Sequence, residues 1–264
     1  MSVMPKTSLV LSNPPVVETV LTIQFADLAD WQAVHHGLLF AKIRDKYPKY
    51  ELQPMQQPIL ESFPATPKMI RLQFTDKTDA GCANFVDNEE TNQLRIQKNR
   101  FAFHWVQPQD KPYPHYRENV TNCRTAYREF LEFCQEEKVG ELKPVLCEVL
   151  YVNHIQPEKD ESVAELIESI FGLTTGAFEL GTFSRTYVLG SNEGRLYCEI
   201  ETPFGEDGSV FVLLKMTSRV RHDSGNVFDT MGKAHDWLIE HFKRLTNRQA
   251  RIDLWGSNEN ISHD

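Results

Sequence analysis

The chain has 264 residues, a formal net charge of −9 and a hydrophobic fraction of 41%, which is the composition of a soluble globular protein. The acidic balance argues against a broad, non-specific nucleic-acid surface, and no apolar run approaches the roughly 18 residues that a membrane span requires. The 5 cysteines are odd in number, lack Cys-x-x-Cys spacing and follow no apolar signal segment. We therefore expect reduced, buried thiols in a cytoplasmic protein.

The first third of the chain predicts a strand, a helix and a proline-rich excursion. Val16–Phe25 is rich in Val, Thr, Ile and Phe, as strands are. Apolar residues then recur at helical spacing, with Asp27 or Asp30 as the expected N-cap. These apolar residues are Trp31, Val34, Leu38, Leu39 and Ile43. Residues 53–68 contain four prolines and predict a surface excursion.

Three strands and a helix are expected to complete this half. Alternation of Ile70, Leu72 and Phe74 predicts one strand. Apolar parity changes between residues 94–96 and residues 101–105, so we place a tight hairpin at Lys98-Asn99. The stripe from Tyr116 to Cys134 then predicts an amphipathic helix that ends near Gly140.

The second half predicts the same order. Residues 145–155 should form a strand, and residues 163–171 a helix closed by Gly172. Three strands are expected at residues 183–189, 195–202 and 209–219. Apolar residues between Phe228 and Leu245 predict the last long helix.

The two halves begin with similar strands, residues 15–23 and 144–152. This similarity favours an α+β fold of two pseudo-repeated βαβββα units, with helices covering one face of a mostly antiparallel sheet. The units would be residues 1–140, including the proline-rich excursion 53–68, and residues 141–264 with the C-terminal tail. They would join edge to edge, in an architecture analogous to the saddle of TATA-binding proteins. The alternative is coincidence, because βαβββα segments resemble one another.

Catalytic and cofactor motifs are absent from the sequence. It contains no phosphate loop, no Gly-x-Gly-x-x-Gly turn, no Gly-x-Ser-x-Gly elbow and no His-Glu-x-x-His. On the last helix, His235 and His241 are six residues apart, which separates them widely around the helix axis. We therefore expect no metal ion and no cofactor.

Two groups of residues remain as candidates for binding a partner. Arg219, Arg221 and His222 end one predicted strand, and Arg100 and His104 flank the predicted hairpin. They could form a polar groove that grips an anion, or they could blunt an exposed sheet edge. Trp237 lies off the apolar stripe of its helix and Trp255 follows a polar tail, so either could anchor a partner or pack onto its own domain.

Several blocks of the sequence resemble a sporadically distributed bacterial family of uncharacterised proteins. The blocks are Asn13–Val20, Arg100–Trp105, Tyr113–Tyr116, His235–Phe242 and Leu254–Gly256. The resemblance implies a protein of about this length with no assigned activity, and the patchy distribution resembles that of defence-associated genes. This chain departs from the family pattern at His104, where the family often has Asn. If the position faces a pocket, a titratable imidazole changes what can bind there.

Three functional hypotheses follow. The leading one is a non-enzymatic binding or regulatory protein that holds a protein partner, as an accessory or antitoxin-like component of a bacterial defence locus. The second is a nucleic-acid-binding or nucleic-acid-processing module that uses the Arg, Lys and His side chains of the sheet. The third is an enzyme with an unfamiliar site around His104, which requires a deep pocket containing that residue and a carboxylate.

Overall fold

The computed structural model describes residues 9–59, 61–62, 80–108, 111–158, 161–173, 181–205 and 208–258. These residues form an α+β fold with one antiparallel sheet. Its strands are β1 (Val16–Phe25), β2 (Lys49–Gln53), β3 (Cys82–Val86), β4 (Asn92–Gln97), β5 (Arg100–Val106), β6 (Pro144–Ile155), β7 (Thr182–Leu189), β8 (Gly194–Glu201) and β9 (Val212–Arg221). The helices are α1 (Ala33–Ile43), α2 (His115–Glu136), α3 (Val163–Phe171), α4 (Val227–Leu245) and α5 (Arg248–Trp255). None of these helices is both long and apolar enough to cross a membrane.

The sheet has the order β2-β3-β4-β5-β1-β6-β9-β8-β7. Its central pair is β1 and β6, the two strands that the sequence marks as similar, and Leu21 of β1 lies opposite Val149 of β6. The remaining strands of each half extend outward from this pair. Both halves of the chain therefore contribute to one continuous sheet.

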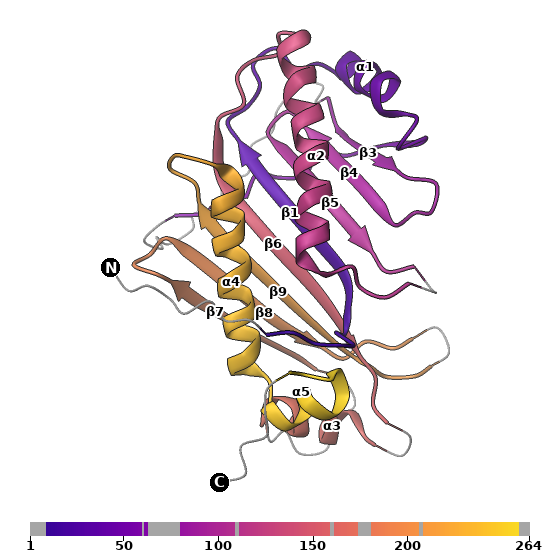
Figure 1. Ribbon diagram of the computed structural model, residues 1–264, viewed down its shortest axis with the longest axis vertical. Helices are drawn as coiled ribbons and strands as arrows, with labels where there is room; N and C mark the ends of the chain where they lie inside the picture. The colour runs from indigo at the N-terminus through magenta and orange to yellow at the C-terminus, as the bar shows by residue number, and fades with distance from the viewer. Residues whose placement is uncertain are drawn as a thin grey trace.

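The two long helices lie on the same side of the sheet, which we call the helix face (Figure 1). Leu21, Ile23 and Val149 point to this side and are fully buried. Phe25 and Phe101 meet Phe130 of α2 there, with ring centroids 6.0 and 5.7 Å apart. Burial of this apolar layer is the main force that holds the helices on the sheet. We call the opposite side the polar face, because its central strands present Gln24, Arg100, His104, Glu148 and Arg219.

Local sequence signals account for several of the element ends. The hairpin between β4 and β5 turns at Lys98-Asn99 as predicted, with Gln97 opposite Arg100. A capping box of Ser162 and Glu165 opens α3, and Gly172 ends it with φ at +62°. A residue without a side chain adopts this left-handed conformation without steric cost.

Other predictions were wrong at the level of single elements. The N-cap of α1 is Gln32, and neither Asp27 nor Asp30 takes that position. The backbone N–H of Gln32 donates to His35 Nδ1 at 2.8 Å. Val34 and Leu38 are 59% and 43% exposed, because the short α1 buries only the face that carries Leu39 and Ile43.

The sequence also failed to predict β2, β3 and α5. The edge strand β2 is almost wholly exposed and therefore has no apolar alternation to detect. Helix α5 occupies what was expected to be a polar tail. The strand predicted around Ile70 to Phe74 lies outside the described residues.

Candidate functional site

An extended segment crosses the polar face of the sheet. We call residues 54–62 the strap; the structure describes all of them except residue 60. Successive strap residues contact successive strands: Gln56 meets Gln97 of β4, Gln57 meets Arg100 of β5, Ile59 meets Gln24 of β1, Glu61 meets Arg219 of β9, and Ser62 meets Arg195 of β8. From β4 to β8 there are five strand spacings, about 24 Å in all. Six steps of extended chain cover about 20–22 Å, and the side chains that reach from the outer strands to the strap supply the remaining distance.

Two glutamines of the sheet hold the strap by its backbone. Gln24 accepts from the N–H of Ile59 at 2.6 Å and donates to its C=O at 3.0 Å. Gln97 accepts from the N–H of Gln56 at 3.0 Å and donates to its C=O at 2.9 Å. Each side-chain amide thus satisfies both polar groups of one strap residue. These contacts place no demand on the strap side chains, except that proline lacks the N–H.

The charged side chain of Glu61 in the strap is held by two residues of the sheet. Its carboxylate is only 4% exposed and accepts a hydrogen bond from Arg219 Nη1 at 2.9 Å and another from the Tyr197 hydroxyl. The Nε of the same guanidinium donates to Glu148 at 2.6 Å, and the guanidinium lies 4.8 Å from the Tyr197 ring centroid. A charge held between two carboxylates in this way has little freedom to bind anything else.

The electrostatics of this cluster follow from burial and charge. Burial disfavours the charged form of Arg219, but Glu148 and Glu61 outweigh that effect and raise the pKa of its guanidinium. Burial also raises the pKa of Tyr197 to about 12, with a further contribution from Glu61. At neutral pH the cluster is therefore a protonated arginine and a neutral tyrosine facing carboxylates.

Arg100 and Arg195 grip the strap at the two ends of its path. Arg100 is 9% exposed and donates to the Gln56 side chain at 2.5 Å and to the C=O of Gln57 at 2.7 Å. Arg195 is 3% exposed and donates to the C=O of Ser62 at 3.4 Å. These two cations of the polar face are therefore buried under the strap rather than presented to solvent.

His104 shares the polar face but does not meet Arg219. Three strand spacings, about 14 Å, separate their strands, because β1 and β6 lie between β5 and β9. His104 Nδ1 lies 3.4 Å from Glu18 Oε1. Burial lowers the pKa of His104 and its hydrogen bond to Glu18 opposes the shift; the same bond lowers the pKa of Glu18. Because the ring is almost fully buried, we take it as a neutral imidazole that donates Nδ1–H to the Glu18 carboxylate.

The remaining sequence candidates lie outside the strap site. Arg221 forms an ion pair at 2.8 Å with exposed Asp223, and the His222 ring lies 2.8 Å from the Thr230 hydroxyl. Trp237 and Trp255 are each 4% exposed. Trp237 fills the space above Gly190 and Gly194, which explains why a residue off the apolar stripe is buried.

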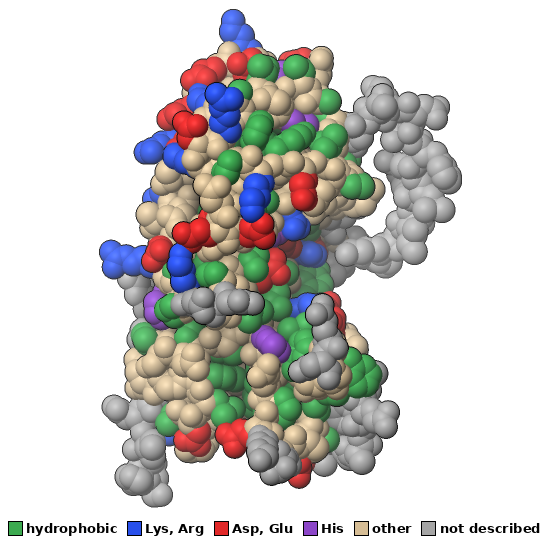
Figure 2. Space-filling view, turned by 90° about the vertical axis from the view of Figure 1, so that its right-hand side faces the viewer, with side chains coloured by type: hydrophobic (Ala, Val, Ile, Leu, Met, Phe, Trp, Pro, Cys, Tyr) green, Lys and Arg blue, Asp and Glu red, His purple; other side chains and the backbone are tan. Residues whose placement is uncertain are grey.

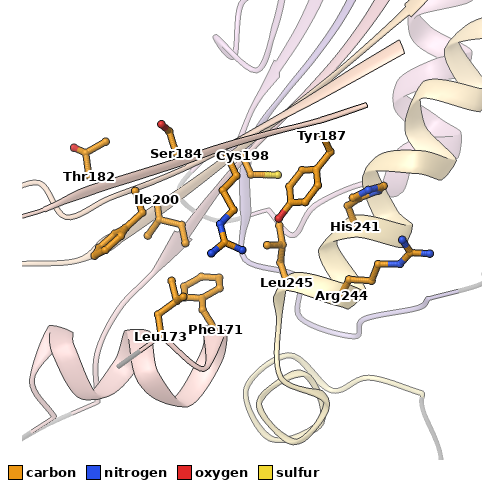
Figure 3. Close-up of a pocket in the computed structure, with 12 residues that line it drawn as sticks. Phe171, Leu173, Thr182, Ser184, Tyr187, Cys198, Ile200, His241, Arg244 and Leu245 are labelled. Carbon is orange, nitrogen blue, oxygen red and sulfur yellow. The ribbon is translucent and has the colours of Figure 1, made fainter. Parts of the chain in front are cut away.

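A cavity of about 510 Å³ lies on the helix face between β7, β8, α3 and α4 (Figure 3). Figure 3 shows Tyr187 beside His241 of α4, with Phe171 and Leu173 on the α3 side; the Tyr187 and His241 ring centroids are 5.1 Å apart. The cavity is bordered by Leu173 and Thr182, which flank residues outside the described ranges. His104 does not line this cavity, nor those of about 420 and 360 Å³ elsewhere on the described surface.

Sequence reasoning singled out Arg219 and Arg100 but missed the residues that complete the site. Gln24 and Gln97 lie within strands, where a polar residue on one face is ordinary. Glu61 lies in the proline-rich segment. Because prolines favour an extended chain, their frequency was the sequence feature that could have indicated an extended segment there. No group of three or more His, Cys, Asp or Glu within the described ranges is arranged to hold a metal ion.

Comparisons with known proteins add no functional assignment. No family model matches the sequence, and no curated protein shows significant similarity to it.

Proposed function

We propose that this chain is a non-enzymatic binding protein whose polar face holds an extended, acidic segment of a protein partner. The strap supports this proposal because it occupies the face as a ligand would. Two side-chain amides bind its backbone, and an Arg–Tyr pair binds one carboxylate. Backbone contacts of this kind accept many sequences, whereas the carboxylate position selects one residue type.

The strap would then act as an internal competitor. A tethered segment has an effective concentration in the millimolar range, so a partner must displace it to bind. Displacement would make the protein regulatory, in agreement with the hypothesis of an accessory or antitoxin-like component. The bacterial defence setting and the cytoplasmic location rest on the sequence expectations alone.

The sheet order supports the proposed duplication. Outward from β1 the neighbouring strands are β5, β4 and β3, and outward from β6 they are β9, β8 and β7. In each half the strand that comes last in the chain therefore lies next to the central pair. We infer that the chain comprises two βαβββα units related by a pseudo-twofold axis between β1 and β6. Their helices α2 and α4 would cover the same face, and β2 would be an addition to the first unit.

The nucleic-acid alternative gains no support from this arrangement. Arg219 is neutralised by two carboxylates, and Lys215 is paired with Glu201 at 2.9 Å. Figure 2 shows basic and acidic side chains interspersed over the face in view, without a continuous basic patch. Phosphate binding would require uncompensated cations.

A synthetic peptide of residues 54–62 tests the proposal. We expect it to bind in trans to the Glu61→Gln variant, whose own strap is weakened, more tightly than to the unaltered protein. The measurement is fluorescence anisotropy of the labelled peptide. The same peptide carrying Gln in place of Glu61 should bind at least about tenfold more weakly, because a charge-assisted pair is lost.

Variants of the protein complete the design. Arg219→Leu in the Glu61→Gln background should abolish discrimination between the two peptides. Arg221→Leu is the matched control, because Arg221 lies two residues further along β9 and contacts only exposed Asp223 in the ion pairs described. Equal affinity of both peptides for the Glu61→Gln variant would refute the proposed groove.

A further inference from the structure

A second cavity, of about 420 Å³, lies on the other side of the sheet from the strap. Its walls come from the segment that leads into β1, the start of α2, the C-terminal half of β6, and α4 from its middle toward its C-terminal end. The start of α2 lies beside α4 in Figure 1, and the stacked rings of Tyr116 and His235 join the two helices at a centroid distance of 3.7 Å. Four segments that are distant in sequence therefore meet around one chamber.

The chamber is largely apolar and aromatic, with hydroxyl groups in its wall. Leu238 and Phe242 line it from α4. Tyr113 donates a hydrogen bond to the Tyr151 hydroxyl at 2.9 Å, and both residues line the cavity. The Tyr116 hydroxyl is buried and has no hydrogen-bond partner among the described residues. An apolar chamber with a few polar groups is the usual form of a small-molecule site.

A buried amide also lies beside Tyr113 of this wall. Asn119 lies next to the Tyr113 hydroxyl and is completely buried. Within the described part of the chain, neither atom of its side-chain amide has a hydrogen-bond partner of good geometry. Buried polar groups without partners are rare, because their desolvation is not offset. The wall of the chamber near Tyr113 therefore contains more buried polar groups than an apolar core would.

The residues around the chamber favour an anion. Its lining includes the cation of Arg117 and the imidazole rings of His115 and His235, and no Asp or Glu is among the described residues that line it. Two acids are near: Glu118 in the first turn of α2, and Asp236, 77% exposed, whose carboxylate is 3.4 Å from His235. Neither lines the cavity.

The first turn of α2 adds a positive end to the chamber. This 22-residue helix begins after Pro114, which provides no side-chain cap for the first N–H groups. Uncapped N–H groups and the helix dipole both attract negative charge. His115 also has φ at +64°, a left-handed conformation that a residue with a side chain adopts at a cost.

We propose that this chamber binds a small carboxylic acid with an apolar, preferably aromatic, body. The body lies against the Tyr116–His235 stack, Leu238 and Phe242, and the carboxylate faces Arg117 and the first turn of α2. The assignment combines cavity, charge and helix geometry, and it does not depend on the strap. It adds a ligand site to a protein whose proposed partner site is on the opposite face.

Isothermal titration calorimetry with a matched pair of probes tests the assignment. We expect 4-phenylbutyrate to bind the full chain about tenfold or more tightly than 4-phenylbutanol, because only the acid gains charge-assisted contacts. Arg117→Gln should remove most of that difference. Arg128→Gln is the matched control, because Arg128 is exposed on the same helix and does not line the cavity.

Two further variants test whether the probe binds in this chamber and not at the strap. Ile239 lines the cavity and is only partly buried, so Ile239→Trp should fill the chamber and abolish binding, with a circular dichroism melt to confirm folding. Glu61→Gln should leave phenylbutyrate affinity unchanged, which separates this site from the strap. Equal binding of acid and alcohol, or no saturable binding of either, would overturn the proposal.

Discussion

Replacing Arg219 with leucine removes the cation at the centre of the strap site. Its guanidinium bonds to the carboxylates of Glu148 and Glu61, whose side chains are 12% and 4% exposed. Leucine removes the cation that both buried carboxylates contact directly, and leaves only the longer-range attraction of Arg100 for Glu148. Breaking a buried ion pair costs about 3–5 kcal/mol; because Arg219 keeps 26% of its side-chain exposure, we expect a loss of about 2–4 kcal/mol in unfolding free energy.

Urea unfolding of single and double variants measures this loss. Adding Glu61→Gln to Arg219→Leu should restore about 1–2 kcal/mol, because one uncompensated carboxylate is removed. Arg221→Leu should cost less than about 1 kcal/mol, since its ion pair is exposed. If Arg219→Leu costs no more than Arg221→Leu, or if the double variant is less stable than Arg219→Leu alone, Arg219 does not hold the two carboxylates in the way described.

Three further predictions concern residues away from that cluster. Because burial lowers the pKa of His104 below its ordinary 6.5, unfolding free energy should fall as the pH drops below about 6.5, where only the unfolded histidine readily takes up a proton. His104→Asn should reduce that slope between pH 7 and pH 5 in urea titrations; an unchanged slope would contradict the assignment. Gly194→Ala should lower the melting temperature, because a Cβ would lie 2.6 Å from the Arg219 carbonyl oxygen, whereas Gly232→Ala, with open space around it in α4, should raise it. Trp255→Ala should cost about 3–5 kcal/mol in urea unfolding, as expected for a buried aromatic residue; a loss below about 1 kcal/mol would mean that this side chain is not packed.

The elements that sequence reasoning located correctly are those with strong local signals. The parity change at Lys98-Asn99 places the β4–β5 hairpin, because successive strand residues face opposite sides of a sheet. Gly172 ends α3 because its left-handed φ suits glycine. Such signals depend only on neighbouring residues, so they can be recognised in the sequence without knowledge of the tertiary structure.

The misses share a different cause. Val34 and Leu38 match a helical stripe, yet they are exposed because the short α1 contacts the rest of the molecule through one face. Trp237 falls outside its stripe and is nevertheless buried, since Gly190 and Gly194 leave room for its ring. In both cases the shape of the neighbouring element, which periodicity does not encode, decides which side chains are covered.

By itself the sequence determined most of the alternation of strands and helices, the similarity of the two opening strands, and a basic cluster on one face of a strand. It did so because hydrophobic periodicity and turn residues act locally. The tertiary structure alone decided that the cluster would be covered. Only folding brings Glu61 to Arg219 across 158 residues of chain and aligns Gln24 with the backbone of Ile59. Buried charges and polar groups require partners, and those partners come from wherever the fold places them.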